Sequence, residues 1–143
     1  WGSFQSASNP CLRDVHEYLL VFSKGDYKLK RDKKERAEGR IDTIPRDDFI
    51  KHTKSIWSFA TERASRVNHP APFPVELPKR CIEMYSFVGD VVLDPFNGSG
   101  TTCVAAKATG RTYVVVDLSD SYCEIAQQRL DTTEAWVAPE VQV

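Results

Sequence analysis

The chain has 143 residues, of which 41% are hydrophobic and 27% are charged, as expected for a globular protein with one apolar core. Its 19 Lys and Arg residues nearly balance its 20 Asp and Glu residues, and the net charge of −1 excludes a global attraction to nucleic acid. No apolar run approaches the ~18 residues of a membrane-spanning helix, so the sequence predicts a protein that is not embedded in a membrane.

The sequence also indicates a compartment and the state of the cysteines. No charged segment followed by an apolar block opens the chain, so no signal peptide is predicted. The first residue is Trp1 rather than Met, which indicates a fragment, a processed piece or one half of a split protein.

No Cys-x-x-Cys pair occurs, so neither zinc nor another metal is predicted, and we expect a reducing, cytoplasmic setting. Three of the four cysteines lie in apolar stretches where small buried thiols are expected; the four are Cys11, Cys81, Cys103 and Cys123.

The N-terminal part of the chain begins as a loop and continues as a predicted strand. Residues 1–14 contain a cluster of Gly, Ser and Asn residues and Pro10, which is typical of loops. Residues 16–23 form an aromatic and aliphatic run closed by Lys24-Gly25-Asp26, which predicts a buried strand followed by a turn. His16 and Glu17 open this strand, where polar residues more often have a structural than a catalytic role.

The segment from residue 24 to residue 54 is locally basic. It contains eleven Lys or Arg and seven Asp or Glu, a local net charge of +4 (11 − 7), and few apolar residues between 28 and 40. Such a composition fits a solvated, partly disordered insert. It also fits a mobile segment that follows a phosphate backbone. Composition alone favours the first interpretation.

An extended segment and a helix precede the central motif. Residues 55–59 alternate polar and apolar side chains, which predicts a short strand or an extended segment. Residues 69–74 include three prolines and must be extended. A helix is predicted to begin near Val75, with Pro78 tolerated in its first turn. The inner face of this helix is expected to carry Leu77, Cys81, Ile82 and Tyr85.

Residues 91–102 form the motif around which the chain is organised. The apolar run from Val91 ends in Asp94, a glycine-rich turn follows, and an Ala-rich run begins at once, which predicts strand, loop and helix. Glycine lets backbone N–H groups approach a ligand closely, and the helix N-terminus behind the loop is electropositive. We therefore expect the loop to hold a small charged cofactor, although short glycine motifs also occur in turns that bind nothing.

A second strand and a second helix complete a βαβ unit. Gly110 is expected to cap the first helix. Residues 113–116 are too continuously apolar for a wet face, so we expect a parallel sheet that is covered on both sides. Ser119 is the expected N-cap of the next helix, and the tail from Asp131 on is expected to be peripheral. The inner stripe of that helix is predicted to comprise Tyr122, Ile125, Ala126, Arg129 and Leu130.

The acid after the second strand narrows the cofactor to a nucleoside. Asp117 follows Gly98 by 19 residues, close to the ~20-residue spacing with which an acid reaches ribose hydroxyls. Cys103 stands where a dinucleotide loop carries Gly or Ala, and no Lys follows Gly100 as it would in a triphosphate loop. Asp94 would repel a pyrophosphate but suits a cationic group, such as the ammonium of S-adenosylmethionine.

Together these motifs resemble those of the amino-group DNA methyltransferases, which act on adenine N6 or cytosine N4. The sequence Asp94-Pro95-Phe96-Asn97-Gly98-Ser99-Gly100-Thr101-Thr102 looks like their cofactor motif. The segment His69-x-Ala71-x-Phe73-Pro74-x-x-Leu77 is similar to the one before that motif in the class whose catalytic half comes first. Tyr113-x-x-x-Asp117 with its following helix also matches, and Arg13-x-x-His16-Glu17-Tyr18 resembles the last strands of the catalytic half. The resemblance covers roughly residues 1–130.

The resemblance implies an α/β chain that forms part of a Rossmann-like, S-adenosylmethionine-dependent methyltransferase fold with a mainly parallel sheet and a basic insert. It divides the chain into the end of a catalytic subregion (1–24), a basic insert that would recognise the target (25–56), a cofactor-binding βαβ region (57–131) and a C-terminal tail (132–143). The implied cofactor-binding residues are Phe73, Pro74, Asp94, Pro95, Phe96, Asn97, Gly98, Ser99, Gly100, Thr101 and Asp117. The implied DNA-binding residues are Lys28, Lys30, Arg31, Lys33, Lys34 and Arg40.

The resemblance also assigns roles within this site. Residues 94–100 would wrap the methionine end of the cofactor, and Asp117 would bind its ribose. Phe73 and Pro74 would line the opposite wall of the same pocket.

One part of the family's pattern is missing from the chain. The catalytic motif, Asp or Ser followed by Pro-Pro-Tyr, should lie before Trp1, and the chain contains no Pro-Pro pair. In the family, the ring of that motif stacks on a target base flipped out of double-stranded DNA, because the target nitrogen is paired inside the duplex. We therefore expect no catalytic residue in this chain, and expect the missing N-terminal catalytic segment in the same or another chain as its partner.

The leading hypothesis is the cofactor-binding portion of a site-specific DNA amino-methyltransferase of a restriction-modification system, in a prokaryotic cytoplasm and associated with the nucleoid. One alternative is a non-catalytic subunit or relic that binds DNA or a partner. Another is a small-molecule or RNA methyltransferase, against which the basic insert and the motif order argue. Overall resemblance leans slightly to cytosine over adenine, while the recognition sequence and the oligomeric state, including a dimer, stay open.

Overall fold

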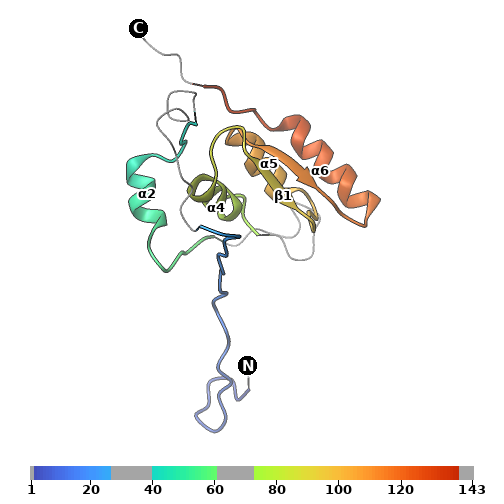
Figure 1. Ribbon diagram of the computed structural model, residues 1–143. Coiled ribbons are helices and arrows are strands. Elements are labelled where there is room, and N and C mark those ends of the chain that lie inside the picture. The colour runs from blue at the N-terminus through green and yellow to red at the C-terminus, as the bar shows by residue number, and fades with distance from the viewer. Residues whose placement is uncertain (1, 27–39, 61–72, 139–143) are drawn as a thin grey trace. The chain divides into compact units, whose positions relative to one another are not determined.

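The computed structural model describes residues 2–26, 40–60 and 73–138, which belong to two compact units, Trp1–Asp32 and Lys33–Val143. The helices and strands of the described residues all lie in the second unit (Figure 1). In chain order they are α2 (Arg46–His52), α4 (Glu76–Tyr85), β1 (Val91–Asp94), α5 (Thr101–Ala108), β2 (Thr112–Val115) and α6 (Asp120–Thr132).

The described part of the first unit, residues 2–26, contains one isolated antiparallel bridge, between Gly2 and Pro10. The predicted buried strand at residues 16–23 is wrong: this stretch is not a strand, and Tyr18 and Phe22 are 83% and 85% exposed. A strand needs a neighbour that accepts and donates its backbone hydrogen bonds. Within the described residues no chain segment provides that neighbour.

The second unit contains the predicted βαβ arrangement. Strands β1 and β2 pair in parallel, with Val91 opposite Thr112 and Asp94 opposite Val115, and α5 connects them. Gly110 follows α5 with a φ of 78°, as expected for a residue that ends a helix. Ser119 caps α6 by accepting a hydrogen bond from the Tyr122 N–H at 3.4 Å.

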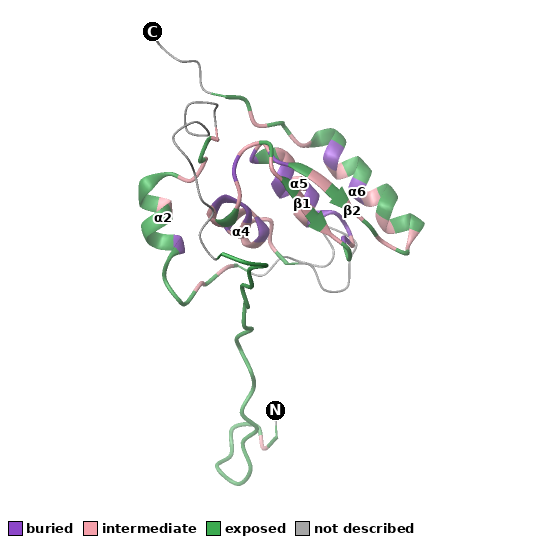
Figure 2. Ribbon diagram, in the orientation of Figure 1, coloured by how far each residue is buried: buried purple, intermediate pink, exposed green. Residues whose placement is uncertain are grey.

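Only one face of this sheet is covered by described residues, which contradicts the expectation of two covered faces. Val92, Tyr113 and Val115 pack against the apolar residues of the helices: Ile82 of α4, Cys103, Ala105 and Ala106 of α5, and Ala126 and Leu130 of α6. Figure 2 shows buried residues along these three helices. On the opposite face the side chains are 52–66% exposed: Val91, Leu93, Val114 and Val116. A continuous apolar run indicates cover on both faces, and the described residues cover one of them.

Helix α4 forms where it was predicted, but part of its buried face was not predicted. Of its predicted inner face, Ile82 is buried while Leu77 and Cys81 are half-buried. Tyr85 is 41% exposed, whereas Arg80 and Glu83 are 6% and 7% exposed. The Arg80 guanidinium lies 5.4 Å from the Trp57 ring centre and 4.5 Å from the Phe59 ring centre. Hydrophobic periodicity could not predict this burial, because the aromatic rings that cover Arg80 come from outside the helix.

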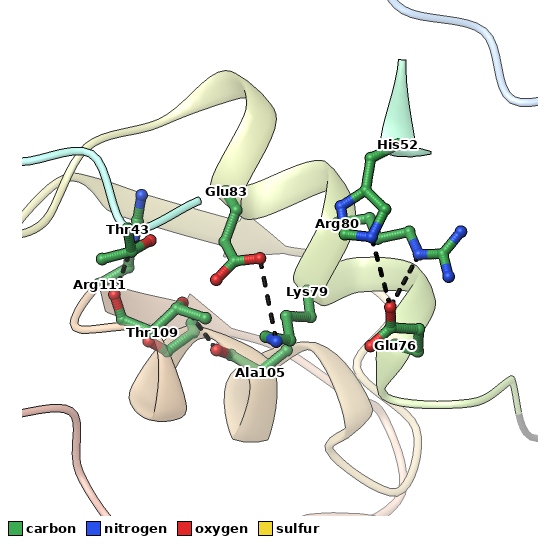
Figure 3. Close-up of polar contacts among 10 residues, drawn as sticks. Thr43, His52, Glu76, Lys79, Arg80, Glu83, Ala105, Thr109 and Arg111 are labelled. Atoms are coloured by element: carbon green, nitrogen blue, oxygen red, sulfur yellow. Dashed lines mark hydrogen bonds and ion pairs between the residues drawn. The ribbon is translucent and has the colours of Figure 1, made fainter. Parts of the chain in front are cut away.

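Residues 40–60, which include the end of the predicted basic insert, belong to the second unit and contact α4 and Arg111. The short helix α2 was not predicted, since charged residues dominate its sequence. His52 at its end is 3% exposed, and its Nε2 lies 3.7 Å from Glu76 Oε1, which accepts a hydrogen bond from Arg80 Nε at 2.8 Å (Figure 3). Burial lowers the pKa of His52, with a smaller contribution from the positive charge of Arg80.

Arg111, which precedes β2, is the most heavily bonded buried side chain of this region. It is 3% exposed and donates to Ser86 Oγ at 3.1 Å, Ser86 O at 2.6 Å, Thr43 Oγ1 at 2.6 Å and Thr109 O at 2.5 Å. Figure 3 shows the neighbouring Glu83, whose pKa burial raises. Arg111 thus joins three segments, around residues 43, 86 and 109, that are distant in sequence.

The tail after α6 is not simply peripheral. The Trp136 N–H donates to Lys107 O at 3.2 Å, and Lys107 Nζ donates to Leu130 O at 2.7 Å. A Cβ atom at Gly110 would lie 2.8 Å from Trp136 Cε3, so the Trp136 ring packs on the glycine.

Two further expectations were that three of the cysteines are buried and that no helix spans a membrane. Cys103 is buried and Cys81 half-buried, but Cys123 is exposed, so the expected buried thiol is wrong at that position. Within the described residues no helix is both long and apolar enough to cross a membrane.

We predict that Arg111→Met lowers the free energy of unfolding by about 2–4 kcal/mol, because one buried and one partly buried carbonyl lose a charged donor. Urea denaturation followed by circular dichroism measures this difference. Arg46→Met is the matched control: the Arg46 side chain is 88% exposed, and we expect a change below about 0.5 kcal/mol. Equal stability of the two variants would contradict the role of Arg111.

Candidate functional site

The candidate site is the loop between β1 and α5, residues 95–100. Gly98 and Gly100 have φ values of 52° and 85°, in the left-handed region that favours glycine. A Cβ atom at Gly100 would lie 2.7 Å from Ala126 Cβ and 2.9 Å from Ala126 Cα. Glycine is therefore required at this position both by the turn and by the close approach of α6.

Backbone hydrogen bonds fold the loop tightly over the end of the sheet. The Asn97 N–H donates to Val116 O at 3.0 Å, and the Gly100 N–H donates to Asn97 O at 3.0 Å. Asn97, Ser99 and Thr101 are only 4–7% exposed, although all three are polar. Among the described residues, no group donates a hydrogen bond to the buried Asn97 Oδ1. A buried acceptor of this kind normally finds a partner, so the atom is available to a bound ligand.

Asp117 connects the loop with the end of the second strand. Its Oδ2 accepts from the Gly98 N–H at 2.8 Å, and its Oδ1 accepts from the Ser119 N–H at 2.9 Å. These bonds fix the carboxylate, and a carboxylate oxygen can accept more than one hydrogen bond, including one from a hydroxyl group. The predicted spacing of 19 residues therefore brings Asp117 into direct contact with the loop.

Asp94 occupies the other strand end. Its Oδ1 accepts from the Phe96 N–H at 2.9 Å, which turns the chain sharply out of β1. Phe96 itself is 87% exposed, so its ring extends away from the core. Asp94 is the last residue of β1 and Asp117 comes shortly after β2, and because the two strands are parallel, their carboxyl ends meet at the same edge of the sheet.

Arg129 of α6 contacts the loop from the side of the helices. Its Nη1 donates to Ser99 O at 2.7 Å and lies 3.2 Å from both Ser99 Oγ and Thr101 Oγ1. The helical spacing predicted Arg129 on the inner stripe of α6 but did not predict its contact with the loop. The available signal was a charged residue on an otherwise apolar face, next to the small Ala126.

The structure therefore brings most of the predicted cofactor residues together, from residue 94 to residue 101 and at Asp117. Phe73 and Pro74 lie just before α4, and no described contact connects them with the loop. Of the predicted DNA contacts, Arg40 has its guanidinium 5.2 Å from the Phe87 ring centre. The others lie outside the described residues: Lys28, Lys30, Arg31, Lys33 and Lys34.

Comparison with known proteins identifies the family of this chain. The family model for N6 and N4 methyltransferases, described as DNA methylase, matches residues 2–128. A type II methyltransferase of Methanothermobacter thermautotrophicus, M.MthZI, is 33% identical over 141 residues, which cover 92% of this chain and 39% of that protein. The chain thus spans about two-fifths of the length of this relative.

Solved structures agree with the sequence comparison. TTHA0409 of Thermus thermophilus, named as a candidate DNA modification methylase, matches with a TM-score of 0.60 and 32% identity. The match covers 83% of this chain and 51% of that one. The same protein complexed with S-adenosyl-L-methionine matches with a TM-score of 0.57 and 33% identity, covering 80% and 47% of the two chains. The described chain is therefore an α/β portion, with a small parallel sheet, of the fold of these methylases.

We predict that Gly100→Ala destabilises the protein more than Gly89→Ala, although both glycines have nearly the same φ, 85° and 84°. Gly89 has open space where a Cβ would stand, so its substitution should cost only the backbone strain of about 1–2 kcal/mol. At Gly100 the clash with Ala126 should add at least about 1 kcal/mol. Urea denaturation of the two variants measures the difference, and equal losses would contradict the close contact between loop and helix.

Proposed function

Because this chain belongs to the N6/N4 family of DNA methylases, we propose that it is the S-adenosylmethionine-binding portion of an enzyme that methylates an exocyclic amino group of DNA. The target atom would be cytosine N4 or adenine N6 at a specific site. The type II methyltransferase among its relatives supports a place in a restriction-modification system.

The contact between Asp117 and the glycine loop carries this proposal. It places a carboxylate that can accept ribose hydroxyls against a loop whose glycines permit close approach to a ligand. The buried Asn97 Oδ1 offers a further acceptor in the same loop. The N-terminus of α5 favours an anionic group, such as the carboxylate of a methionine, while Asp94 suits its ammonium. The residues present therefore fit S-adenosylmethionine.

Each part of the cofactor then has proposed partners. Residues 94–101 would hold the methionine end, Asp117 the ribose, and Phe73 and Pro74 the opposite wall. When bound, S-adenosylmethionine supplies a methyl group activated by its sulfonium. The role of this chain is to bind and orient that group and to exclude water from it.

The residues that act on the target base would belong to the part of the enzyme that this chain does not contain. The chain spans 39% of the length of M.MthZI, and its own sequence has no Pro-Pro-Tyr motif. We place residues 1–24 at the end of a catalytic subregion, residues 57–131 in the cofactor region and residues 132–143 in a tail. The base would be flipped out of double-stranded DNA, since its amino group is otherwise paired.

The basic segment is the proposed DNA contact and covers residues 25–56. Its positive charge stands out from a chain whose net charge is −1. Within this segment, Thr43 accepts from Arg111 at 2.6 Å and His52 Nε2 lies 3.7 Å from Glu76 Oε1 of α4, contacts that would connect the DNA-contacting segment with the cofactor region.

We predict that the protein in its natural length binds S-adenosylmethionine and that Asp117→Ala weakens this binding by about 1–3 kcal/mol, since ribose hydroxyls lose a charged acceptor. Isothermal titration calorimetry measures both dissociation constants. Asp120→Ala, in the exposed first turn of α6, is the matched control and should bind normally. Absence of binding by the wild-type protein would refute the proposed function, and favour a subunit that binds DNA or a partner without catalysis. An unchanged constant in Asp117→Ala would refute the ribose role alone.

We predict that replacing Lys28, Lys30, Arg31, Lys33 and Lys34 together by Ala weakens DNA binding and makes its salt dependence shallower. Each lost phosphate contact should reduce the slope of log K against log salt by about 0.9. Fluorescence anisotropy with labelled duplex DNA at several salt concentrations measures the slope. Affinity for S-adenosylmethionine serves as the control and should not change. If affinity for DNA and slope are both unaltered, another surface contacts the DNA.

A further inference from the structure

We propose that Arg129 is a positioning residue that holds the glycine loop in its cofactor-binding conformation before the cofactor arrives. This inference rests on the proposed function, because it assigns the ligand of the loop. Arg129 is the one described charged side chain that donates hydrogen bonds to the loop from α6, outside the sheet edge that carries Asp94 and Asp117.

The contact with Arg129 fixes one peptide group of the loop at both ends. The carbonyl of Ser99 accepts from Arg129 Nη1 at 2.7 Å, and the N–H of Gly100, in the same peptide group, donates to Asn97 O at 3.0 Å. Because a peptide group is planar, these two bonds set the direction of the whole unit.

The peptide group between Asn97 and Gly98 is also held at both ends by hydrogen bonds. Asn97 O accepts from the Gly100 N–H, and the Gly98 N–H donates to Asp117 Oδ2 at 2.8 Å. The peptide group between Gly98 and Ser99 thus lies between two fixed neighbours, one held by Asp117 and the other by Arg129. The two charged side chains, of opposite sign, hold the loop from two places: Asp117 from the connection between β2 and α6, and Arg129 from α6.

Because the loop is buried, water cannot easily replace the hydrogen bonds that Arg129 donates to it. Ser99 and Thr101 are 4% and 5% exposed, and both hydroxyl groups lie 3.2 Å from Arg129 Nη1. Without the guanidinium, the Ser99 carbonyl would lose a charged donor in a place that water reaches poorly. We expect the loop to recover hydrogen bonds by changing the conformation at Gly98 and Gly100, where glycine permits many conformations.

The contact between Arg129 and the loop should raise the affinity for the cofactor, because the loop is ordered before the cofactor binds. A loop that has to be ordered by the ligand binds more weakly, because the ordering free energy is subtracted from the binding free energy. Arg129 does not need to contact the cofactor to have this effect. Loss of Arg129 should therefore weaken binding of S-adenosylmethionine and S-adenosylhomocysteine by a similar factor, since both must use the same ordered loop.

The test compares Arg129→Met, Arg129→Lys and the control Gln128→Met in the protein of natural length. Met keeps the apolar stem and removes the donors, Lys keeps the charge on a shorter side chain, and Gln128 is exposed on the neighbouring position of α6. Calorimetric titration with S-adenosylmethionine should give a dissociation constant raised on the order of tenfold for Arg129→Met. The increase should be smaller for Arg129→Lys and absent for Gln128→Met.

Two further readouts separate positioning from general stability and from the proposed function. Native-state hydrogen exchange without cofactor should be faster at the Gly98 and Gly100 amides in Arg129→Met, with unchanged exchange in β1. A variant with a lower melting temperature but wild-type affinity and wild-type exchange in the loop would overturn the inference. If the wild-type protein does not bind the cofactor, the proposed function fails, whereas the exchange experiment still decides whether Arg129 orders the loop.

Discussion

The parallel pairing of β1 and β2 is the constraint on which the rest of the site depends. Parallel strands need a crossover connection, and here α5 supplies it. The crossover brings the carboxyl ends of both strands to one edge, so that Asp94 and Asp117 end up on either side of one glycine loop. The hydrogen bond between the Gly98 N–H and Asp117 then joins two points that are 19 residues apart in the chain.

Buried polar side chains next to the helices fix the position of residues 40–60. Arg111 joins the segments around Thr43, Ser86 and Thr109, and Arg80 is covered by the rings of Trp57 and Phe59. Such groups are stable inside a protein only when their hydrogen bonds are satisfied, so they demand one specific arrangement. This explains how a short, charged stretch such as residues 40–60 obtains a defined position against α4.

The uncovered face of the sheet is consistent with a chain that represents part of a larger fold. The chain covers 51% of the length of TTHA0409 and 39% of M.MthZI, while its exposed strand residues are as apolar as those that face the helices. The exposed run at residues 16–23 has the same character. In both places apolar side chains are exposed, and the described residues do not cover them.

Local patterns in the sequence determined the central motif: the strand from Val91, the glycine turn, the helix, and the acid that follows the second strand. These depend on backbone preferences and short-range periodicity, which single residues and their neighbours decide. Only the tertiary structure decided that Arg80 and Glu83 of α4 are buried, that the tail docks through Trp136, and that Arg129 reaches the loop. These contacts depend on which residue, distant in sequence, supplies an aromatic ring, a carbonyl or a hydrogen-bond donor. No local sequence pattern contains that information.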